Sequence, residues 1–460
     1  MEIVFFIFIF ILVIIAIVAL SGGIRGENEL GDAKTIKNLG ELDGETGGDE
    51  KPILLGIDST GQEIFYTGEK HLLAFGSTRS GKGVGALIPN AVKYSGPMLI
   101  FDPKNEAQPV VEELAPHKQM FVCAPLSENP GNLSIDLLAI VRKARDINAA
   151  ISSVCELIVV PSTHATQIFF ENEARSLLKG VLLVYAARAD GSLSQVVELI
   201  TCERDKLRAK LTEFANDPTV SPEAVVQIHR YLDKTANEES GVLSVLRQNL
   251  GFLDNPRILN SLNEGVGDIA RLLDDNVVVS FVLPPRDFIY YYRWARLVIG
   301  LSLFELLNER RQNVLLIIDE MTAVGELKIL SQAYALMAGY GVRIWSLFQD
   351  LSQLRMRYPI DWESFVSNSG VVQCFSASDV FSAEYISQRI GNATKVVDIR
   401  SAGKFTQSAH SFPALTSDQI ARMPAKNGIL LLENNQPMLF KKIRHYEYFY
   451  EEQSTETSNQ

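Results

Sequence analysis

A glycine-rich loop holds the residues whose types and spacing are best suited to chemistry. Residues 76–83 read Gly-Ser-Thr-Arg-Ser-Gly-Lys-Gly, and G-x-x-x-x-G-K between a strand-like and a helix-like stretch is typical of a phosphate-binding loop. Backbone N–H groups would surround the phosphates, and Lys82 would reach the β and γ phosphates. Gly83 stands where a serine or threonine usually offers a hydroxyl to Mg²⁺. The predicted ATP-binding residues are Gly76, Ser77, Thr78, Arg79, Ser80, Gly81, Lys82 and Gly83.

Two carboxylates, Asp319 and Glu320, end the apolar run Val314–Ile318. We predict that Asp319 holds Mg²⁺ through water and that Glu320 orients or deprotonates the water that attacks the γ phosphate. Taken singly, the loop fits an ordinary turn with an exposed lysine, and the two carboxylates fit the polar end of a buried strand. Both motifs occur in this order, each after a strand-like run, and together they predict a P-loop ATPase in which Lys82 and Glu320 are catalytic.

Two further polar segments follow apolar runs. Gln349 ends the run Val342–Phe348, which we expect to lie beside the strand of Asp319. Its amide would sense the γ phosphate and is predicted to be catalytic, although a polar cap on a strand end fits the residue equally well. Lys104 and Glu106, in the segment after Asp102, either line the nucleotide pocket or belong to a solvated turn.

Apolar runs bounded by turn residues predict the strands that position these groups. They are Ile53–Ile57, Gln62–Tyr66, His71–Phe75, Pro97–Phe101, Gln119–Cys123, Asn276–Leu283, Val314–Ile318 and Val342–Phe348. Between Leu133 and Leu273 the periodicity is helical instead, as in Phe169–Ala187 and Pro222–Leu232. The sequence predicts an α/β fold with a mostly parallel sheet in residues 51–140 and 270–446, interrupted by an all-α domain in residues 141–269. Residues 447–460 are predicted to form a disordered acidic and polar tail.

The N-terminal residues predict a membrane anchor. Ile3–Leu20 is an uninterrupted apolar run without a charge, so residues 1–20 are expected to form one transmembrane helix. Glu2 at its start argues against a secretory signal peptide. Arg25, Lys34 and Lys37 follow the run, which places the bulk of the chain in the cytoplasm, on the inner face of the cytoplasmic membrane. Residues 21–50, rich in glycine and acidic side chains, are expected to be a flexible linker.

Charge and cysteine content exclude other classes of protein. The net charge of -12 excludes a protein that coats nucleic acid with a broad basic face, so any contact with DNA must be local. The four cysteines are widely spaced, without a C-x-x-C pair, which predicts free thiols and no cysteine metal site.

Several motifs together resemble one family, the TraG-type coupling ATPases of conjugation and type IV secretion. They are the loop 76–85, Phe101-Asp-Pro-Lys-Asn-Glu106, Leu316–Gly325, Met337–Arg343, Phe348–Leu354 and Leu415–Ile420. The resemblance implies a RecA-like motor, usually assembled as a hexameric ring, with a helical domain that selects cargo. It also implies the partners: single-stranded DNA carrying a relaxase, effector proteins, and the inner-membrane components of the secretion channel.

The resemblance leaves two points open. Some relatives place an arginine finger where this chain has Ala338, so Arg343, Arg293 and Arg296 are the candidates for that role. Such proteins also commonly have two membrane helices, and this chain has one apolar run. The alternative functions are a ring-forming translocase of duplex DNA and a nucleotide-gated cargo adaptor that does not hydrolyse ATP; the intact Lys82, Asp319 and Glu320 argue against the adaptor.

Overall fold

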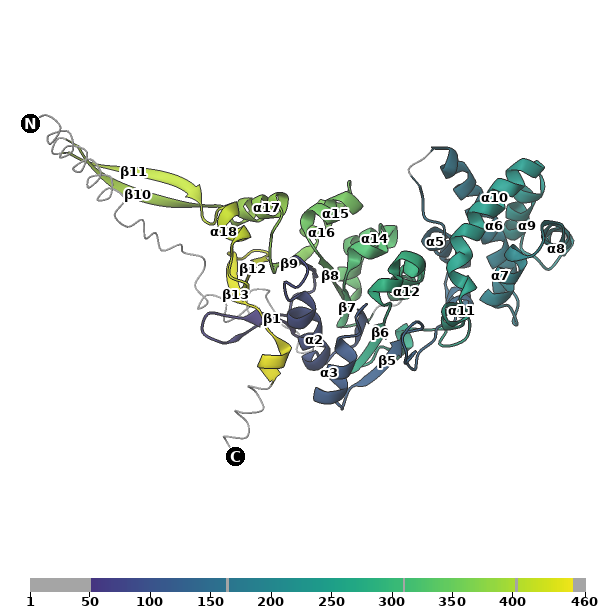
Figure 1. Cartoon of the computed structure of the whole chain (residues 1–460), viewed down its shortest axis with the longest axis horizontal. Helices are drawn as coiled ribbons and strands as arrows, with labels where there is room; N and C mark the ends of the chain where they lie inside the picture. The colour runs from purple at the N-terminus through teal and green to yellow at the C-terminus, as the bar shows by residue number, and fades with distance from the viewer. Residues whose placement is uncertain (1–50, 163–164, 309–310, 402–403, 450–460) are drawn as a thin grey trace, which may run out of the picture.

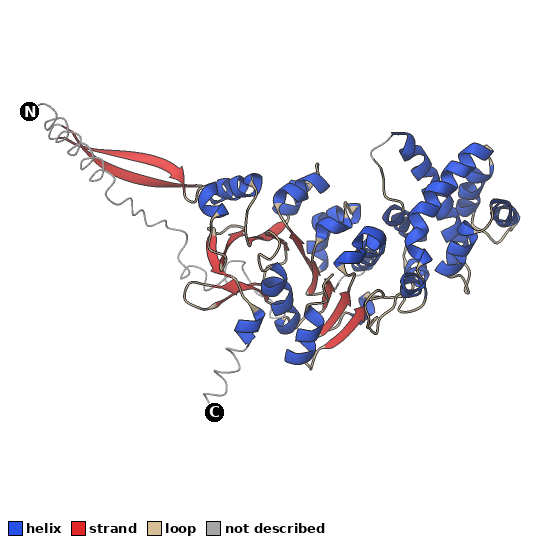
Figure 2. Ribbon diagram, viewed as in Figure 1, coloured by secondary structure: helices blue, strands red, loops and turns tan. Residues whose placement is uncertain are grey.

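A computed structural model describes residues 51–449, except 163–164, 309–310 and 402–403. The predicted transmembrane helix and linker, and residues 450–460 of the predicted tail, lie outside this part. The main feature is an eleven-stranded sheet in the order β2-β1-β13-β12-β9-β3-β8-β7-β4-β6-β5, with helices on both of its faces (Figures 1 and 2).

The sheet is parallel from β9 to β5 and antiparallel from β9 to β2. The parallel strands are β9 (Ser369–Cys374), β3 (His71–Phe75), β8 (Val342–Phe348), β7 (Val314–Ile318), β4 (Met98–Phe101), β6 (Val277–Phe281) and β5 (Gln119–Cys123). The antiparallel edge consists of β12 (Asn427–Leu432), β13 (Met438–Lys441), β1 (Ile53–Ile57) and β2 (Glu63–Tyr66). The prediction of a mostly parallel sheet is confirmed.

Alternate residues of the parallel strands face two hydrophobic cores. Leu73 and Phe75 pack in one core with α12 (Phe288–Asn308), whereas Leu72 and Ala74 pack in the other with α2 (Ile88–Lys93). The remaining helices on the sheet are α3 (Ala107–Leu114), α13 (Met321–Val324), α14 (Lys328–Leu336), α15 (Leu351–Arg357), α16 (Trp362–Ser367), α17 (Val380–Ile390) and α18 (Ser417–Ala421). Because both faces are covered, the central strands are apolar throughout, which is why continuous apolar runs identified them.

A group of helices connects β5 to β6 and lies at one end of the molecule (Figure 1). It comprises α4 (Leu137–Lys143), α5 (Ile147–Ile158), α6 (Ala165–Ala186), α7 (Leu193–Thr201), α8 (Arg204–Asn216), α9 (Pro222–Leu232), α10 (Ala236–Leu250) and α11 (Pro256–Asn263). We call these helices the helical segment; no strand occurs in the part of it that the structure describes. Side-chain oxygens of Asp136, Asp146, Ser192 and Thr235 cap the N-termini of α4, α5, α7 and α10, which explains where these helices begin.

At the opposite end, a two-stranded ribbon extends from the body (Figure 1). It is formed by β10 (Asn392–Ser401) and β11 (Lys404–Pro413), paired antiparallel from Asn392 with Pro413 to Ser401 with Lys404. The sequence reasoning did not predict it.

Two predictions concern the ends of the chain. Within the described residues, no helix has both the length and the apolar character needed to cross a membrane. Residues 445–449 are helical and Phe449 is 6% exposed. The prediction of a disordered tail is therefore wrong for residues 447–449, because burial of this aromatic ring orders them.

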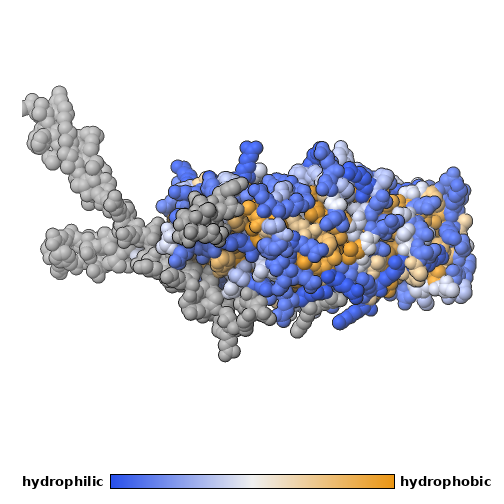
Figure 3. All heavy atoms as spheres, turned by 90° about the horizontal axis from the view of Figure 1, so that it is seen from below, coloured by the Kyte–Doolittle hydropathy of each residue, from blue (hydrophilic) through white to orange (hydrophobic). Residues whose placement is uncertain are grey.

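The face shown in Figure 3 is mainly hydrophilic, with apolar residues visible near its middle.

Candidate functional site

Four neighbouring parallel strands bring the predicted site residues to one edge of the sheet. The order is β3-β8-β7-β4, and the register pairs Phe75 with Phe348 and Phe101 with Ile318. Because the carboxyl ends of parallel strands lie at the same edge, the segments that follow them meet there. These segments carry the glycine-rich loop, Gln349, the pair Asp319 and Glu320, and Asp102. The expectation that β8 lies beside the strand of Asp319 is confirmed.

The glycine-rich loop is tightly wound around its own lysine. Lys82 is 7% exposed, and its Nζ donates hydrogen bonds to the carbonyl oxygens of Gly76 and Ser77, the latter at 3.3 Å. Burial lowers the pKa of Lys82, and the nearby carboxylates of Asp319 and Glu320 oppose this shift. Arg79 and Gly81 have φ values of 64° and 99°, a region that costs strain for an arginine and none for a glycine.

Close packing at the start of the loop requires its first glycine. A Cβ on Gly76 would lie 2.7 Å from Cβ of Phe375 and 2.6 Å from Oγ of Ser80. Ser77 donates its N–H to Oγ of Ser376 at 2.9 Å. The hydroxyl of Ser80 is buried and has no hydrogen-bond partner among the described residues. An unpaired hydroxyl in this position fits a loop that receives a phosphate oxygen.

The loop continues into one π-helical turn, Gly83–Leu87, and then into α2. Pro89 is the second residue of α2 and follows this turn directly, so its missing N–H cannot donate a hydrogen bond to the turn before it. The change from π-helical to α-helical geometry falls next to this proline.

Asp319 is buried beside the loop. It is 5% exposed, and no group of the described residues donates a hydrogen bond to its carboxylate. Burial, followed by repulsion from Glu320, raises the pKa of Asp319 to about 6. Carboxylate oxygens are ligands that Mg²⁺ takes when it is bound to a nucleotide. The buried Asp319 carboxylate, near Lys82, therefore fits the predicted metal site.

Glu320 adopts a strained backbone conformation and contacts Gln349. Its φ of 52° and ψ of 41° place a non-glycine residue in the left-handed region, which is typical of functional sites. Nε2 of Gln349 lies 3.2 Å from Oε2 of Glu320, and Nε2 of Gln353 lies 3.2 Å from Oε1 of Gln349. The two glutamines thus link the predicted catalytic carboxylate to α15.

Asp102 organises the turn that carries Lys104 and Glu106. Its Oδ2 accepts a hydrogen bond from the Ala107 N–H at 2.8 Å, and its Oδ1 accepts one from the Lys104 N–H at 3.3 Å. Burial is the main cause that raises the pKa of Asp102 to about 6. Both Lys104 and Glu106 are exposed.

Sequence reasoning missed three residues of this site. Asp350 caps α15 through the Gln353 N–H at 2.7 Å, burial raises its pKa, and its charge attracts Lys82. Ser376 contacts the loop as described above, and the Cδ atom of Lys442 would lie 3.9 Å from a Cβ on Gly81. Burial lowers the pKa of Lys442 to about 8. Asp350 had a local signal, because an aspartate after a strand often caps a helix. Ser376 and Lys442 lie far from the loop in the sequence, at positions 376 and 442, and only the tertiary structure brings them to it.

The three candidate arginine fingers all bind groups of their own chain. Arg343, 3% exposed at the amino end of β8, donates to the Lys51 carbonyl at 2.8 Å and to Oη of Tyr94. Arg293 donates to Oδ1 of Asn249 at 2.8 Å. Arg296 donates to three carbonyl oxygens, those of Leu157, Val324 and Glu326, at 3.1, 3.1 and 2.7 Å.

The chain is similar to several known proteins. A family model for "Type IV secretory system Conjugative DNA transfer" matches residues 26–460. The chain is 26% identical over 399 residues to the conjugal transfer protein TraG of Escherichia coli, covering 78% of this chain and 62% of that protein. It is 24% identical over 404 residues to the protein VirD4 of Agrobacterium fabrum, covering 82% and 59%. The chain thus spans about three fifths of the length of these relatives.

Solved structures of the bacterial conjugative coupling protein TrwB share the fold. The trigonal form with sulphate has a TM-score of 0.68 at 14% identity, covering 90% of this chain and 93% of that one. The form with ADP and Mg²⁺ has a TM-score of 0.65 at 15% identity, covering 90% and 92%. The chain therefore shares the mixed α/β fold of TrwB. Since the family model matches all but the first 25 residues, the chain belongs to the type IV secretory system conjugative DNA transfer family.

Proposed function

We propose that this protein is a membrane-anchored coupling ATPase that brings DNA, with or without attached protein, to a type IV secretion channel and drives its transfer. The observation that carries the proposal is that Lys82, Asp319, Glu320 and Gln349 converge at one edge of the sheet. The match to the conjugative DNA transfer family and the similarity to the conjugal transfer protein TraG support a role in the transfer of DNA.

Each residue has a separate role in the proposed hydrolysis of ATP. Lys82 exchanges its hydrogen bonds to the loop carbonyls for the β and γ phosphates, and the loop N–H groups bind the same oxygens. Asp319 would hold Mg²⁺, and the ion would neutralise charge on the phosphates. Glu320 orients the attacking water and accepts its proton. Gln349 loses its contact with Glu320 when it turns to the γ phosphate, and so reports nucleotide to α15 through Gln353.

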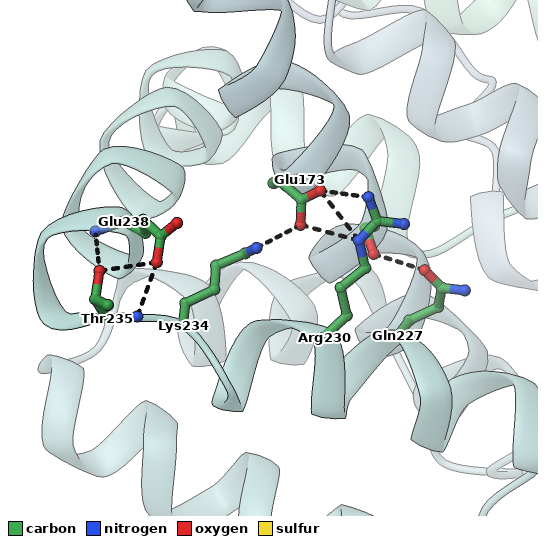
Figure 4. A network of polar contacts seen from close by, with 7 residues as sticks. Glu173, Gln227, Arg230, Lys234, Thr235 and Glu238 are labelled. Atoms are coloured by element: carbon green, nitrogen blue, oxygen red, sulfur yellow. Dashed lines mark hydrogen bonds and ion pairs between the residues drawn. The ribbon is translucent and has the colours of Figure 1, made fainter.

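The proposed cargo domain, residues 141–269, takes in most of the helical segment. A polar network between α6 and α9 holds it together (Figure 4). The buried Glu173 accepts hydrogen bonds from Nε of Arg230 at 3.0 Å and pairs with Nζ of Lys234 at 2.7 Å, while the hydroxyl of Ser176 lies 2.6 Å from Oε1 of Gln227. Paired buried charges of this kind fix the relative positions of two helices, as a docking platform requires.

Assembly and location complete the proposal. A homo-hexameric ring would complete nucleotide sites between subunits, and residues 1–20 would anchor it in the cytoplasmic membrane with the bulk of the chain in the cytoplasm. The single-stranded DNA with its relaxase, or an effector protein, would pass from the helical segment to the inner-membrane components of the channel.

The test is ATP hydrolysis by the detergent-solubilised full chain, measured with and without single-stranded and duplex oligonucleotides. We expect hydrolysis that single-stranded DNA stimulates more than duplex DNA does. Equal or greater stimulation by duplex DNA would favour the translocase of duplex DNA, and nucleotide binding without steady turnover would favour the adaptor.

A further inference from the structure

Gly83 and Glu106 meet beside the P-loop lysine. Gly83 occupies the position where most P-loops carry the hydroxyl that binds Mg²⁺, and a Cβ built on it would lie 3.0 Å from Oε2 of Glu106. We propose that the carboxylate of Glu106 replaces the missing hydroxyl and, together with Asp319, holds the magnesium ion of the bound nucleotide. The proposal rests on the proposed function, because it concerns the metal of that nucleotide.

The backbone around Glu106 is organised to present this side chain. Asp102 closes the turn through its two carboxylate contacts to backbone N–H groups, and Asn105 adopts a left-handed φ of 53°. Its side-chain amide lies 3.0 Å from Oε1 of Gln108. The turn ends at Glu106, which is the N-cap residue of α3 but makes no side-chain capping bond. The carboxylate is therefore not engaged by the helix that it begins.

No other group of the described residues takes up this carboxylate. Neither a hydrogen-bond donor nor a lysine or arginine within ion-pair distance is found for it in that part of the chain. Among the described helices, four aspartate N-cap residues cap their helix through the carboxylate, Asp136, Asp146, Asp350 and Asp379, whereas Asp361 and the glutamates Glu106, Glu203 and Glu320 do not. Glu106 points toward Gly83 instead.

The chemistry of the two residues suits magnesium. Mg²⁺ takes six oxygen ligands in a protein and is usually held by one or two carboxylates, phosphate oxygens and water. Glu106 follows β4 and Asp319 follows β7, which are adjacent parallel strands in register at Phe101 and Ile318. The two carboxylates thus come from neighbouring strand ends at the edge that holds Lys82. This arrangement also explains the glycine, because any side chain at position 83 would crowd the carboxylate.

The first experiment measures metal affinity without hydrolysis. The full chain in detergent is saturated with a non-hydrolysable ATP analogue and titrated with Mn²⁺, with free Mn²⁺ followed by electron paramagnetic resonance. We expect Glu106→Ala to weaken Mn²⁺ binding about ten- to hundredfold, as loss of a metal-supporting group does. Glu113→Ala is the control, since Glu113 is exposed on the same helix α3 and its loss changes the net charge equally. Parental Mn²⁺ affinity in Glu106→Ala would overturn the proposal.

The second experiment exchanges the two groups. Gly83 has a backbone conformation that serine can adopt, so Gly83→Ser combined with Glu106→Ala should restore the hydroxyl of an ordinary P-loop and recover most of the lost Mn²⁺ affinity. Gly83→Ser alone, with Glu106 intact, should not bind Mn²⁺ more tightly than the parent, because the added side chain meets Glu106. Failure of the double variant to bind Mn²⁺ better than Glu106→Ala would contradict the replacement.

Two further outcomes separate this inference from the proposed function. If Glu106→Gln loses turnover while Mn²⁺ affinity stays parental, Glu106 is the general base and the metal assignment is wrong. If the parent binds Mn²⁺ with nucleotide through Glu106 but does not hydrolyse ATP, the metal assignment stands and the proposed ATPase fails.

Discussion

The helical segment and the carboxyl edge of the sheet bury carboxylates in opposite ways. In the helical segment, Glu173 is 4% exposed and is bound by Arg230 and Lys234 (Figure 4); Glu171, 6% exposed, accepts the Ser162 N–H at 2.9 and 3.0 Å. At the carboxyl edge of the sheet, Asp319 is as deeply buried, yet no hydrogen bond from a described residue reaches its carboxylate.

This difference separates structural charges from charges kept for a ligand. A buried carboxylate without partners destabilises the fold, whereas one that is paired and hydrogen bonded does not. The helical segment satisfies its charges internally, while the sheet edge carries an unsatisfied negative charge and an unpaired Ser80 hydroxyl. Each of the following changes should act on one of these two regions, the helical segment or the carboxyl edge of the sheet, and leave the other unaffected.

The largest effect is expected from Lys82→Ala. Lys82 contacts the phosphates in both the ground state and the transition state, so binding and turnover should be lost together. Loss of a charge-assisted hydrogen bond of about 1.5–3 kcal/mol would weaken ATP binding roughly ten- to hundredfold. Equilibrium binding of a fluorescent ATP analogue and phosphate release measure the two effects. Normal ATP affinity in this variant would show that the lysine does not reach the phosphates.

Glu320→Gln should separate binding from hydrolysis. The amide keeps the shape of the side chain but removes its basic oxygen, so phosphate release should fall by about 10²–10⁴-fold while ATP affinity stays near that of the parent. Mixed with the parent protein in cells, the variant should also block transfer, because rings that contain it stall with ATP bound. Near-normal phosphate release would place the general base elsewhere, with Glu106 as the first candidate.

Glu173→Ala tests the helical segment. It leaves Lys234, whose side chain is 11% exposed, without its carboxylate, and should lower the free energy of unfolding by about 2 kcal/mol. Glu203→Ala removes an exposed pair with Lys206 and should cost under about 0.5 kcal/mol. Urea unfolding followed by circular dichroism compares the two variants, and ATP affinity should stay unchanged in both. A loss of ATP affinity in Glu173→Ala would mean that the helical segment and the carboxyl edge of the sheet are not independent.

The smallest effect is a pH-dependent gain in stability from Asp319→Asn. Burial raises the pKa of Asp319 from its ordinary 3.8 to about 6, so between these values the folded protein binds more protons than the unfolded chain. Its stability therefore falls as pH rises through this window. The asparagine variant lacks this loss, and without nucleotide it should be more stable than the parent by on the order of 1 kcal/mol at pH 7 and by less at pH 5. Thermal unfolding at both pH values measures this; equal gains would show that Asp319 is not desolvated in solution.

The sequence predicted β1, β2 and every parallel strand except β9, and it missed β9, β12 and β13 between them. The bounds predicted for β3, β5, β7 and β8 are those observed, because these strands are buried on both faces and read as apolar runs. The strand β12 is just as apolar, but its place depends on antiparallel pairing with β9 and β13, which no local pattern specifies. The ribbon of β10 and β11 has no apolar run at all.

The same limit applies to the site. Lys82, Asp319, Glu320 and Gln349 could be named because each follows a strand whose order in a parallel sheet is predictable. The proximity of Glu106 to Gly83 could not be predicted from spacing, because it depends on how Asp102 closes a turn. Nor could the pairing of Ser77 with Ser376, because it joins distant parts of the chain.

Arg296 has one more consequence. Among the described residues, its guanidinium donates hydrogen bonds to main-chain oxygens alone, one at the end of α5 and two in the segment after Glu320. A joint made in this way does not depend on which side chains those segments carry. The contact can thus survive evolutionary change of the side chains in both segments, so that the sequence around it can drift while Arg296 is kept.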